Sequence, residues 1–445
     1  MIERLAREAA RSSAPTSSTL RTPRIRDPRC ESDRAVATDQ IVEGRLLRSR
    51  SGALVAALSA STLATGVTQI SVPLELRQLH ASPTETGIAL SMFGLGMFLF
   101  EWVWGALADR VGYRLPLVVS QMLYAGGIVL LASARSVPLI AVSYLLASGM
   151  MVAAGPLGRS FLGTTLPPRL RATGLAFIAS QWIVAGAIGS GVGGQLIEHF
   201  PIRNVLYGAS VLPLIAALLL LLVFSGYRET RGIWSQGGEE PAPVPAARGE
   251  SFMRVMVLTA GIVLLFEIGS GGELALLPLL ATNQLNMSAA SAGTVMFIVG
   301  LLAGLLLVPG GMASDRWGKR RTMAIGGVLS AAGFVAYAVA GSFWAVIVGA
   351  ALRAIGSALV WPAVTAWISE SAPHRRHALA MGIFGEFENL GVTLGPVAGG
   401  LAWSAAGIQA AFFTYAVTAV LVAVVSAIAV SGRVRAPGPV GAIEA

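Results

Sequence analysis

The stretches GALADRVGYR at residues 105–114 and GMASDRWGKR at residues 311–320 decide the fold of this chain. Each follows a long apolar run, and each combines a glycine, an Asp-Arg pair, a second glycine and a basic end. The two stretches are 206 residues apart, and one ungapped offset of that length holds over more than 100 residues. Further pairs at this offset are Gly87 with Gly293, Pro156 with Pro362, and Gly194 with Gly400. The chain therefore contains an internal repeat.

The composition excludes the soluble classes of protein. Of the 445 residues, 54 % are hydrophobic and 12 % are charged, whereas soluble domains carry about 25 % charged residues. A soluble protein needs charge over its outside, so we exclude a soluble enzyme, a disordered chain and a disulfide scaffold. Cys30 is the single cysteine, which leaves no internal disulfide and no cysteine-based metal site. We expect no metal ion and no catalytic residue set.

Uncharged runs of about 20 residues predict membrane-spanning helices. The runs are continuous rather than alternating, which favours helices over a β-barrel. Breaks at polar residues, glycines and prolines divide them into twelve predicted helices, at residues 52–76, 86–108, 114–134, 137–159, 172–197, 204–226, 254–281, 290–313, 321–340, 343–369, 377–403 and 408–431. The predicted fold class is an all-α integral membrane protein. Its two six-helix bundles share one orientation, so a pseudo-twofold axis along the membrane normal relates them, with a substrate site between them.

The domain organisation follows from these helices. The first 50 residues hold 11 arginines and no apolar segment long enough for a signal peptide. We expect them to form a disordered cytoplasmic tail rich in Arg, Ser and Pro, unless translation starts further along the chain. The predicted units are the tail at 1–50, an N-terminal bundle at 51–226, a cytoplasmic linker at 227–253, a C-terminal bundle at 254–431 and a second cytoplasmic tail at 432–445.

The basic residues predict the orientation in the membrane. Of the 32 Lys and Arg residues, 28 fall on the side of the two termini, three fall on the opposite side, and Arg353 lies within a helix. Such a bias places both termini in the cytoplasm of a multi-pass protein of the cell (inner or plasma) membrane. The net charge of +9 thus reflects topology, and we expect no nucleic-acid partner.

Over residues 52–431 the sequence resembles the major facilitator superfamily of secondary transporters. The most specific element is the loop after the second helix, which reads approximately G-x-L-A-D-R-x-G-R-K in the family. This chain matches it with Gly105, Leu107, Ala108, Asp109, Arg110, Gly112 and Arg114, and has Tyr113 where the family often has a basic residue. The partner loop matches with Gly311, Asp315, Arg316, Gly318, Lys319 and Arg320.

The resemblance implies that these two loops form a cytoplasmic gate. In the family they latch the two halves together in the outward-open state. A missing side chain at Gly105 and Gly311 would let another helix approach, and Asp109 and Asp315 could meet a helix N-terminus. We expect Glu101, one or two turns above the first loop, to support this gate. The alternative is that the loop residues only form turns and set topology.

A second motif is GVTLGPVAGG at residues 391–400. Its glycines Gly391, Gly395 and Gly399 are four residues apart and share a helix face, with Pro396 and Gly400 beside them. It resembles the family's G-x-x-x-G-P-x-x-G-G motif, which is associated with antiporters. That motif normally lies on the fifth helix and here lies on the eleventh, so tight helix packing between the halves is the alternative.

Charged residues inside predicted helices are functional candidates, because a charge near the bilayer centre costs about 2.5–3.5 kcal/mol. Glu267 and Arg353 lie near the midplane of the seventh and tenth helices, which face the central cavity in the family. We expect them to pair, or Glu267 to alternate between Arg353 and a proton, and a permanent structural bridge is the alternative. Glu273 lies near the outer helix end, where we expect it to reach water.

Further polar residues complete the predicted cavity. Glu386 and Glu388 are two residues apart on the eleventh helix, so they cannot both face one cavity. Ser61, Thr65 and Gln69 share one face of the first helix, which lines the cavity in the family. We expect them to bind substrate by hydrogen bonds, and bonds between helices are the alternative.

The leading functional prediction is a secondary transporter that works by alternating access, as a proton-coupled antiporter exporting small amphipathic organic compounds. The chain has no G-x-x-x-x-G-K-[ST] phosphate loop, so the proton gradient rather than ATP or a cofactor is the expected energy source. The expected partners are a small-molecule substrate and the lipid bilayer, and the expected state is a monomer. The alternatives are a sugar or metabolite transporter, a non-transporting receptor or scaffold, and, third, a membrane enzyme.

Overall fold

The computed structural model describes residues 28–165, 168–225, 252–373 and 376–429. Their secondary structure is helical, with no strand among the described residues. The elements are α2 (Pro28–Gln78), α3 (Pro83–Val111), α4 (Arg114–Ser133), α5 (Val137–Met151), α6 (Ala154–Thr165), α7 (Pro168–His199), α8 (Ile202–Ala209), α9 (Val211–Val223), α10 (Phe252–Leu279), the π-helical turn η2 (Leu280–Gln284), α11 (Ala289–Trp317), α12 (Lys319–Ala338), α13 (Phe343–Ser371), α14 (His377–Ala406) and α15 (Ile408–Ala429).

These elements confirm the predicted all-α membrane fold with twelve transmembrane segments. Three segments are each built from two elements: α5 with α6, α8 with α9, and α10 with η2. Within the described chain, ten segments are long and apolar enough to cross a membrane. The other two, α7 and α14, have 32 and 30 residues. Each of these two helices packs against a helix of the other half of the chain.

Prolines explain two interruptions that the predicted helices did not include. Pro156 follows the turn at Val152 and Ala153, and Pro213 follows the end of α8 at Ala209. A proline lacks an N–H and its ring clashes with the carbonyl four residues earlier, which is Val152 in the first case and Ala209 in the second. Both helices therefore break four residues before the proline.

The N-terminal boundary differs from the prediction. Helix α2 begins at Pro28, so part of the stretch that we expected to be irregular is helical. Proline is favoured at the first helical position, and the residues between it and Gly44 include neither glycine nor proline. The remainder of the predicted tail, residues 1–27, lies outside the described residues, as do the linker at 226–251 and the end of the chain from residue 430.

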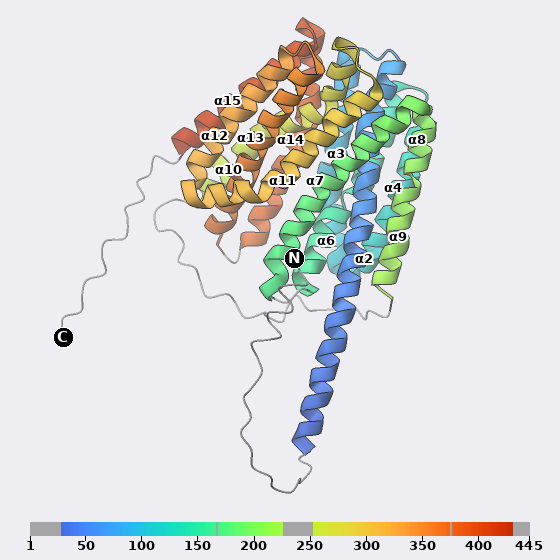
Figure 1. Ribbon diagram of the computed structural model, residues 1–445, viewed down its shortest axis with the longest axis vertical. Helices are drawn as coiled ribbons and strands as arrows, with labels where there is room; N and C mark the ends of the chain where they lie inside the picture. Colours follow the sequence, from blue (N-terminus) through green and yellow to red (C-terminus); the bar gives the residue numbers. More distant parts are fainter. Residues whose placement is uncertain (1–27, 166–167, 226–251, 374–375, 430–445) are drawn as a thin grey trace, which may run out of the picture. The chain divides into compact units, whose positions relative to one another are not determined.

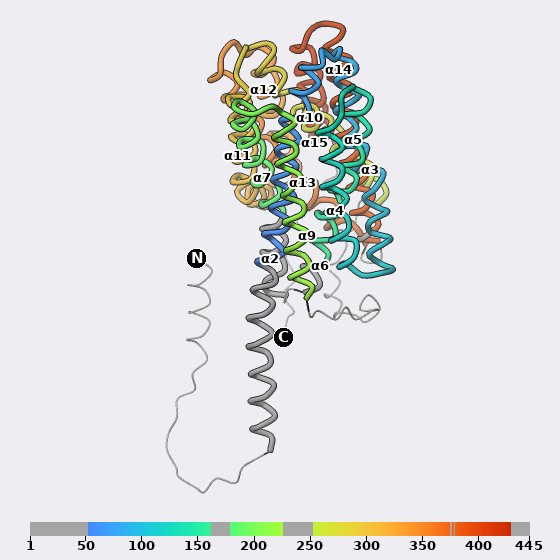
Figure 2. The backbone as a smooth tube through the Cα atoms, turned by 90° about the vertical axis from the view of Figure 1, so that its right-hand side faces the viewer, coloured from blue at the N-terminus to red at the C-terminus, as the bar shows by residue number. Residues whose placement is uncertain are grey.

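From residue 50 onward the helices form two halves, α2–α9 and α10–α15 (Figure 1). Two helix pairs join the halves: α3 packs against α14, and α7 packs against α11. Figure 2 shows α7 beside α11 in the view from the side. We call the end that carries Gly112 and Gly318 the motif face and the opposite end the far face. Gly112 and Gly318 take φ angles of 85° and 83°, which favour glycine, and they end α3 and α11 at equivalent points of the repeat.

The apolar core is shared at the far face and divided at the motif face. One cluster contains buried residues of both halves, such as Ile70 and Tyr144 together with Leu276 and Tyr415. Toward the motif face each half has a cluster of its own. The halves therefore meet at the far face and pack independently near the motif loops.

Repeat-related glycines bring the halves together at the far face. A Cβ atom on Gly87 of α3 would lie 2.9 Å from the Cα of Gly400 on α14. A Cβ atom on Gly194 of α7 would lie 2.7 Å from the Cα of Gly293 on α11. These helix pairs thus touch backbone to backbone, at two seams that the repeat relates to each other. At the second seam, Oε2 of Glu198 also accepts a hydrogen bond of 3.3 Å from the Ala290 N–H near the start of α11.

The motif face lacks such contacts. An ideal Cβ on Gly105 has nothing within 4 Å, and one on Gly311 meets only Pro362 of its own half, at 3.9 Å. The close helix approach that we expected at these two glycines is therefore absent from this conformation. The reason is that each half has an apolar cluster of its own near the motif face, so the two halves do not pack on each other at these glycines.

We predict that Gly400→Leu prevents the far face from closing. The new side chain would meet the backbone of Gly87, and overpacking of this kind costs about 1–3 kcal/mol, which shifts a two-state equilibrium about 5- to 150-fold. Spin labels on His80→Cys and Ser404→Cys, both exposed and on opposite halves, report the separation in a Cys30→Ser background. We expect their distance distribution to shift to longer values.

Gly126→Leu is the matched control, because an ideal Cβ at this exposed position of α4 has nothing within 4 Å. Its distance distribution should equal that of the parent protein. An unchanged distribution in Gly400→Leu would show that the seam does not hold the far face closed.

Candidate functional site

Helix α14 lies at the centre of the candidate site because it contacts both halves. Its Gly391 packs against Glu267 of α10, and an ideal Cβ there would lie 2.6 Å from the Cβ of Glu267. Glu388 lies three residues before Gly391 and so on the same side of the helix. Oε1 of Glu388 accepts a hydrogen bond of 3.3 Å from Nε1 of Trp361 on α13. The carboxylates of Glu267 and Glu388 are thus neighbours, with an indole beside them.

The next residue of α14 faces the other half. Nδ2 of Asn389 donates a hydrogen bond of 2.7 Å to Oε2 of Glu101 on α3. Glu101 is partly buried, and Gly385 of α14 lies beside it. This is a polar contact between the halves on the motif side of the seam. The structure therefore places Glu101 at the junction of the halves, one turn before Gly105 and about two turns before Asp109.

Glu386 lies two residues before Glu388 on the same helix and is partly exposed. Among the described residues, no hydrogen bond or ion pair to Glu386 occurs. Glu386 lies three residues before Asn389 and so on the same side of α14, whereas Glu388 lies on a different side. Glu388 lies beside the indole of its own half, and Asn389 reaches across to α3.

The expected pairing of Glu267 with Arg353 is wrong. Nε of Arg353 instead lies 2.8 Å from Oε2 of Glu273, and both side chains are less than a tenth exposed. Glu273 therefore does not reach water, as we had expected. The two glutamates are six residues apart on α10, which turns Glu273 by about 240° and moves it about 9 Å along the axis. Arg353 faces the interior of the C-terminal half, where Glu273 is its ion-pair partner among the described residues.

Each nitrogen of the Arg353 guanidinium donates one hydrogen bond, with Nε bonding to Glu273. Nη1 donates to Ser330 at 3.0 Å and Nη2 to Ser270 at 3.1 Å. The guanidinium carbon lies 4.5 Å from the ring centroid of Phe334, a cation–π contact. Tyr337 completes the cluster by donating a hydrogen bond of 2.8 Å to Oε1 of Glu273. The cluster joins α10, α12 and α13, and the hollow beside it has no room for a water molecule.

The predicted gate residues lie apart from this buried chemistry. Asp109 and Arg110 are exposed in the last turn of α3, and Arg114 is exposed at the start of α4. Asp315 and Arg316 are exposed in the last turn of α11, and Gly318 is exposed directly after it. The motifs that we expected to be loops are thus mostly helix ends. Lys319 pairs with Glu370 of its own half. The gate thus remains a prediction for a conformation in which the loops approach each other.

The three polar residues predicted on one face of the first helix have different surroundings. Thr65 bonds to Tyr124 at 3.0 Å within the N-terminal half. Ser61 is fully buried and its Oγ has no partner among the described residues. Gln69 alone reaches the space between the halves, where it lines a pocket. The three residues that we expected to act together are therefore not brought to one site.

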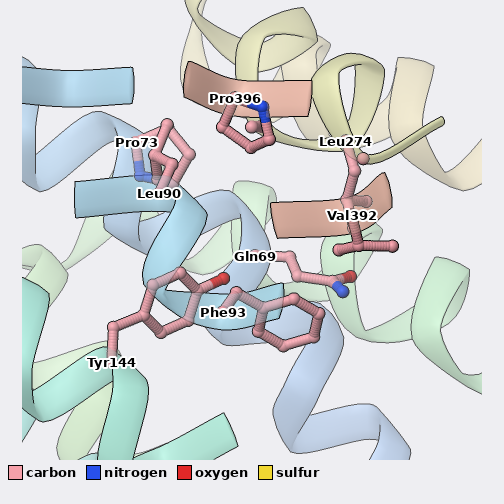
Figure 3. Close-up of a pocket in the computed structure, with 10 residues that line it drawn as sticks. Gln69, Pro73, Leu90, Phe93, Tyr144, Leu274, Val392 and Pro396 are labelled. Atoms are coloured by element: carbon pink, nitrogen blue, oxygen red, sulfur yellow. The ribbon is translucent and has the colours of Figure 1, made fainter. Parts of the chain in front are cut away.

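The pocket lies between the halves, away from the carboxylates (Figure 3). Its walls are Gln69, Pro73, Leu90, Phe93 and Tyr144 from the N-terminal half, and Gly271, Leu274, Ala275, Val392 and Pro396 from the C-terminal half. Its volume is about 10 Å³, at the lower limit of the roughly 10–15 Å³ that one water molecule needs. Tyr144 was not among the predicted site residues, although it is the one aromatic residue of its apolar segment.

The glycine motif of α14 packs on three neighbours. An ideal Cβ on Gly395 would lie 2.6 Å from the backbone nitrogen of Gly272 on α10. An ideal Cβ on Gly399 would lie 2.6 Å from Cδ1 of Leu276 on the same helix. The hydroxyl of Tyr415 on α15 donates to the carbonyl of Gly395 at 3.0 Å, and Gly400 meets α3. This arrangement favours the packing interpretation of the motif, while Pro396 lines the pocket within an unbroken helix.

Comparison with known proteins identifies the family. A family model described as Major Facilitator Superfamily matches residues 54–271 and 259–445. The chain is 21 % identical over 413 residues to the MFS-type transporter YfiU of Bacillus subtilis (strain 168), covering 78 % of this chain and 76 % of that protein. It is 22 % identical over 333 residues to Multidrug resistance protein 1 of the same organism, covering 74 % of this chain and 83 % of that protein.

A solved structure has the same fold. The bacterial homologue of the human lysosomal transporter Spinster, in an inward-facing and unoccupied conformation, superposes with a TM-score of 0.69 at 14 % identity. The superposition covers 86 % of this chain and 97 % of that one. The matched family model spans both halves, and the family's members are transporters rather than enzymes. The chain therefore belongs to the major facilitator superfamily and is a multi-pass membrane transporter.

Proposed function

We propose that this transporter is a proton-coupled antiporter that exports small amphipathic organic cations across the cell membrane. It acts as a monomer, with its termini and motif face in the cytoplasm, and it needs no cofactor beyond the proton gradient. The excess of Arg and Lys on that side supports the orientation. The match to Multidrug resistance protein 1 supports the substrate class.

The observation that carries the proposal is the placement of Glu267 beside Glu388. Glu267 is 8 % exposed, and Arg353 pairs with Glu273. Arg159 of α6 is near enough to interact with the charge of Glu388. Two neighbouring carboxylates in a medium of low dielectric constant resist joint ionisation. They therefore tend to hold one proton between them, and a substrate cation that arrives beside them can take the place of that proton.

The surroundings of the two carboxylates suit such an exchange. Trp361 offers an aromatic face, which attracts an organic cation, and its N–H holds Glu388 in place. Asn389 and Glu101 connect the same turn of α14 to the other half. A change in the charge of Glu267 or Glu388 would therefore act close to a contact that must break or re-form when the halves move.

The conformation agrees with one state of an alternating-access cycle. The far-face seams are closed, the motif ends are separate, and the pocket between the halves has shrunk to the size of a water molecule. With the motif face in the cytoplasm, this arrangement corresponds to an inward-facing state. In the opposite state the seams would open and the Asp109 and Asp315 loops would meet.

We predict that Glu267→Gln abolishes proton coupling without abolishing the pathway. Proteoliposomes with an acidic interior and a clamped membrane potential should accumulate ethyltriphenylphosphonium through the parent protein. In Glu267→Gln this accumulation should fall at least tenfold, because the site no longer exchanges a proton, while downhill flux persists. The measurement is the initial rate and the plateau of uptake.

Glu370→Gln is the matched control, because this glutamate of the same half is exposed, and surface ion pairs contribute little. It should accumulate the cation as the parent protein does. Full gradient-driven accumulation by Glu267→Gln would assign the coupling to other groups. The absence of flux through the parent protein for any organic cation offered would refute the proposed exporter.

We predict a different effect for Glu273→Gln, namely loss of stability. Removing one partner of a buried ion pair typically costs about 3–5 kcal/mol, because the other charge remains without its partner. The midpoint of thermal unfolding in detergent, followed by size-exclusion chromatography, should fall clearly for Glu273→Gln and little for Glu267→Gln. The double variant Arg353→Met with Glu273→Leu should recover part of the loss.

Transport measurements separate this structural role from a coupling role. The double variant should retain gradient-driven accumulation of the cation if the pair only holds the three helices together. A Glu273→Gln protein with unchanged stability and no accumulation would instead place the pair in the coupling mechanism.

A further inference from the structure

The pocket between the halves lies further from the motif face than the carboxylates do. On α10 its wall residue Leu274 follows Glu267 by seven residues, or about 10 Å along the helix. On α14 its wall residue Val392 follows Glu388 by four residues, or about 6 Å. The far-face seam at Gly87 and Gly400 lies beyond it. A substrate that crosses between the halves must therefore pass the carboxylates and this pocket in succession.

The walls of the pocket differ in polarity between the halves. The C-terminal half contributes only glycine, proline and aliphatic residues, and no wall residue is charged. The hydrogen-bonding side chains are Gln69 on α2 and Tyr144 on α5, both from the N-terminal half. Figure 3 shows the Tyr144 hydroxyl and the Gln69 amide on either side of the Phe93 ring. The rings of Phe93 and Tyr144 have centroids 5.4 Å apart.

The polar groups of Gln69 and Tyr144 are available to a ligand. Among the described residues, neither the Gln69 amide nor the Tyr144 hydroxyl makes a hydrogen bond. Tyr124, in the same half, is bonded to Thr65. Tyr144 is 4 % exposed, and Gln69 and Tyr144 both line the pocket. Their polar groups are therefore open to a molecule that enters the pocket, which can bond to them without displacing a bond within the protein.

We propose that Gln69 and Tyr144 determine substrate specificity by binding an uncharged polar group of the passing compound. This inference rests on the proposed function, because it assumes a substrate cation whose charge is held by the carboxylates. The amide and the hydroxyl can each donate and accept, so they suit a hydroxyl, carbonyl, ether or amide group. The apolar part of the compound rests against Phe93 and the aliphatic wall of the C-terminal half.

The physical basis for selectivity is the contrast between the two kinds of wall. An apolar wall discriminates weakly between compounds of similar shape, whereas a site that must satisfy its own polar groups discriminates strongly against a compound that lacks the matching group. In the closed conformation the pocket has room for about one water molecule. Opening of the far-face seam would widen it and expose both polar groups to the substrate.

The test uses two cations that differ by one hydroxyl group, (2-hydroxyethyl)triphenylphosphonium and ethyltriphenylphosphonium. Initial rates of gradient-driven uptake into proteoliposomes give KM and the maximal rate for the parent protein, Gln69→Leu and Tyr144→Phe. We expect each variant to raise KM for the hydroxyl compound about three- to tenfold, as the loss of one hydrogen bond predicts. KM for the ethyl compound should stay within twofold.

Matched controls are Gln78→Leu at the exposed end of α2 and Tyr207→Phe at an exposed position of α8. Both should leave the KM values of the two compounds unchanged. If Gln69→Leu is not recovered in folded form, Gln69→Met, which is closer in shape, replaces it. Tyr144→Phe removes only the hydroxyl and keeps the ring contact with Phe93.

Two results would overturn the inference while leaving the proposed function in place. They are an equal rise in KM for both compounds, which indicates a packing role, and no change for either compound, which places the pair outside the path. If the parent protein transports neither cation, the proposed function fails and this inference fails with it.

Discussion

The backbone contact between helices of opposite halves is the constraint on which the rest of the structure depends. At each seam a glycine lies against a glycine, so the two helices approach without intervening side chains. This contact closes the far face, joins the two halves in one apolar core there and shrinks the pocket between them.

The two halves share a backbone plan but differ in chemistry. The neighbouring carboxylates and the Arg353 cluster belong to the C-terminal half, whereas the pocket's hydrogen-bonding groups come from the N-terminal half. At the repeat offset, Glu267 corresponds to Ser61 and Arg353 corresponds to Ala147. The carboxylate pair thus belongs to one half and the neutral groups of the pocket to the other, and a compound between the halves meets both.

Much of the fold could be predicted from the sequence, because long uncharged runs and a repeat with one offset leave few architectures open. The ion-pair partner of Arg353 could not be predicted from the sequence. Glu267 and Glu273 both lie within the membrane-spanning part of α10, and the direction in which each side chain leaves the helix decides which of them meets Arg353. The sequence did contain polar residues within the apolar helices that bond to the Arg353–Glu273 pair, namely Ser270, Ser330 and Tyr337. Tyr144 gave no signal, since its role depends on where α5 meets the other half. The helix breaks before Pro156 and Pro213 follow from the effect of proline on a helix, but the continuous apolar runs around them led to the prediction of unbroken helices.

The seams have a consequence for how such a chain can arise. Each half carries one glycine of each seam: Gly87 and Gly194 in the first half, and Gly293 and Gly400 in the second. Position 87 of one half meets the equivalent of position 194 in the other, and the reverse holds at the second seam. This reciprocity is the definition of an isologous interface, the kind found in twofold symmetric dimers. The chain thus contains the interface of a homodimer between halves that are now covalently joined, so their association no longer depends on protein concentration.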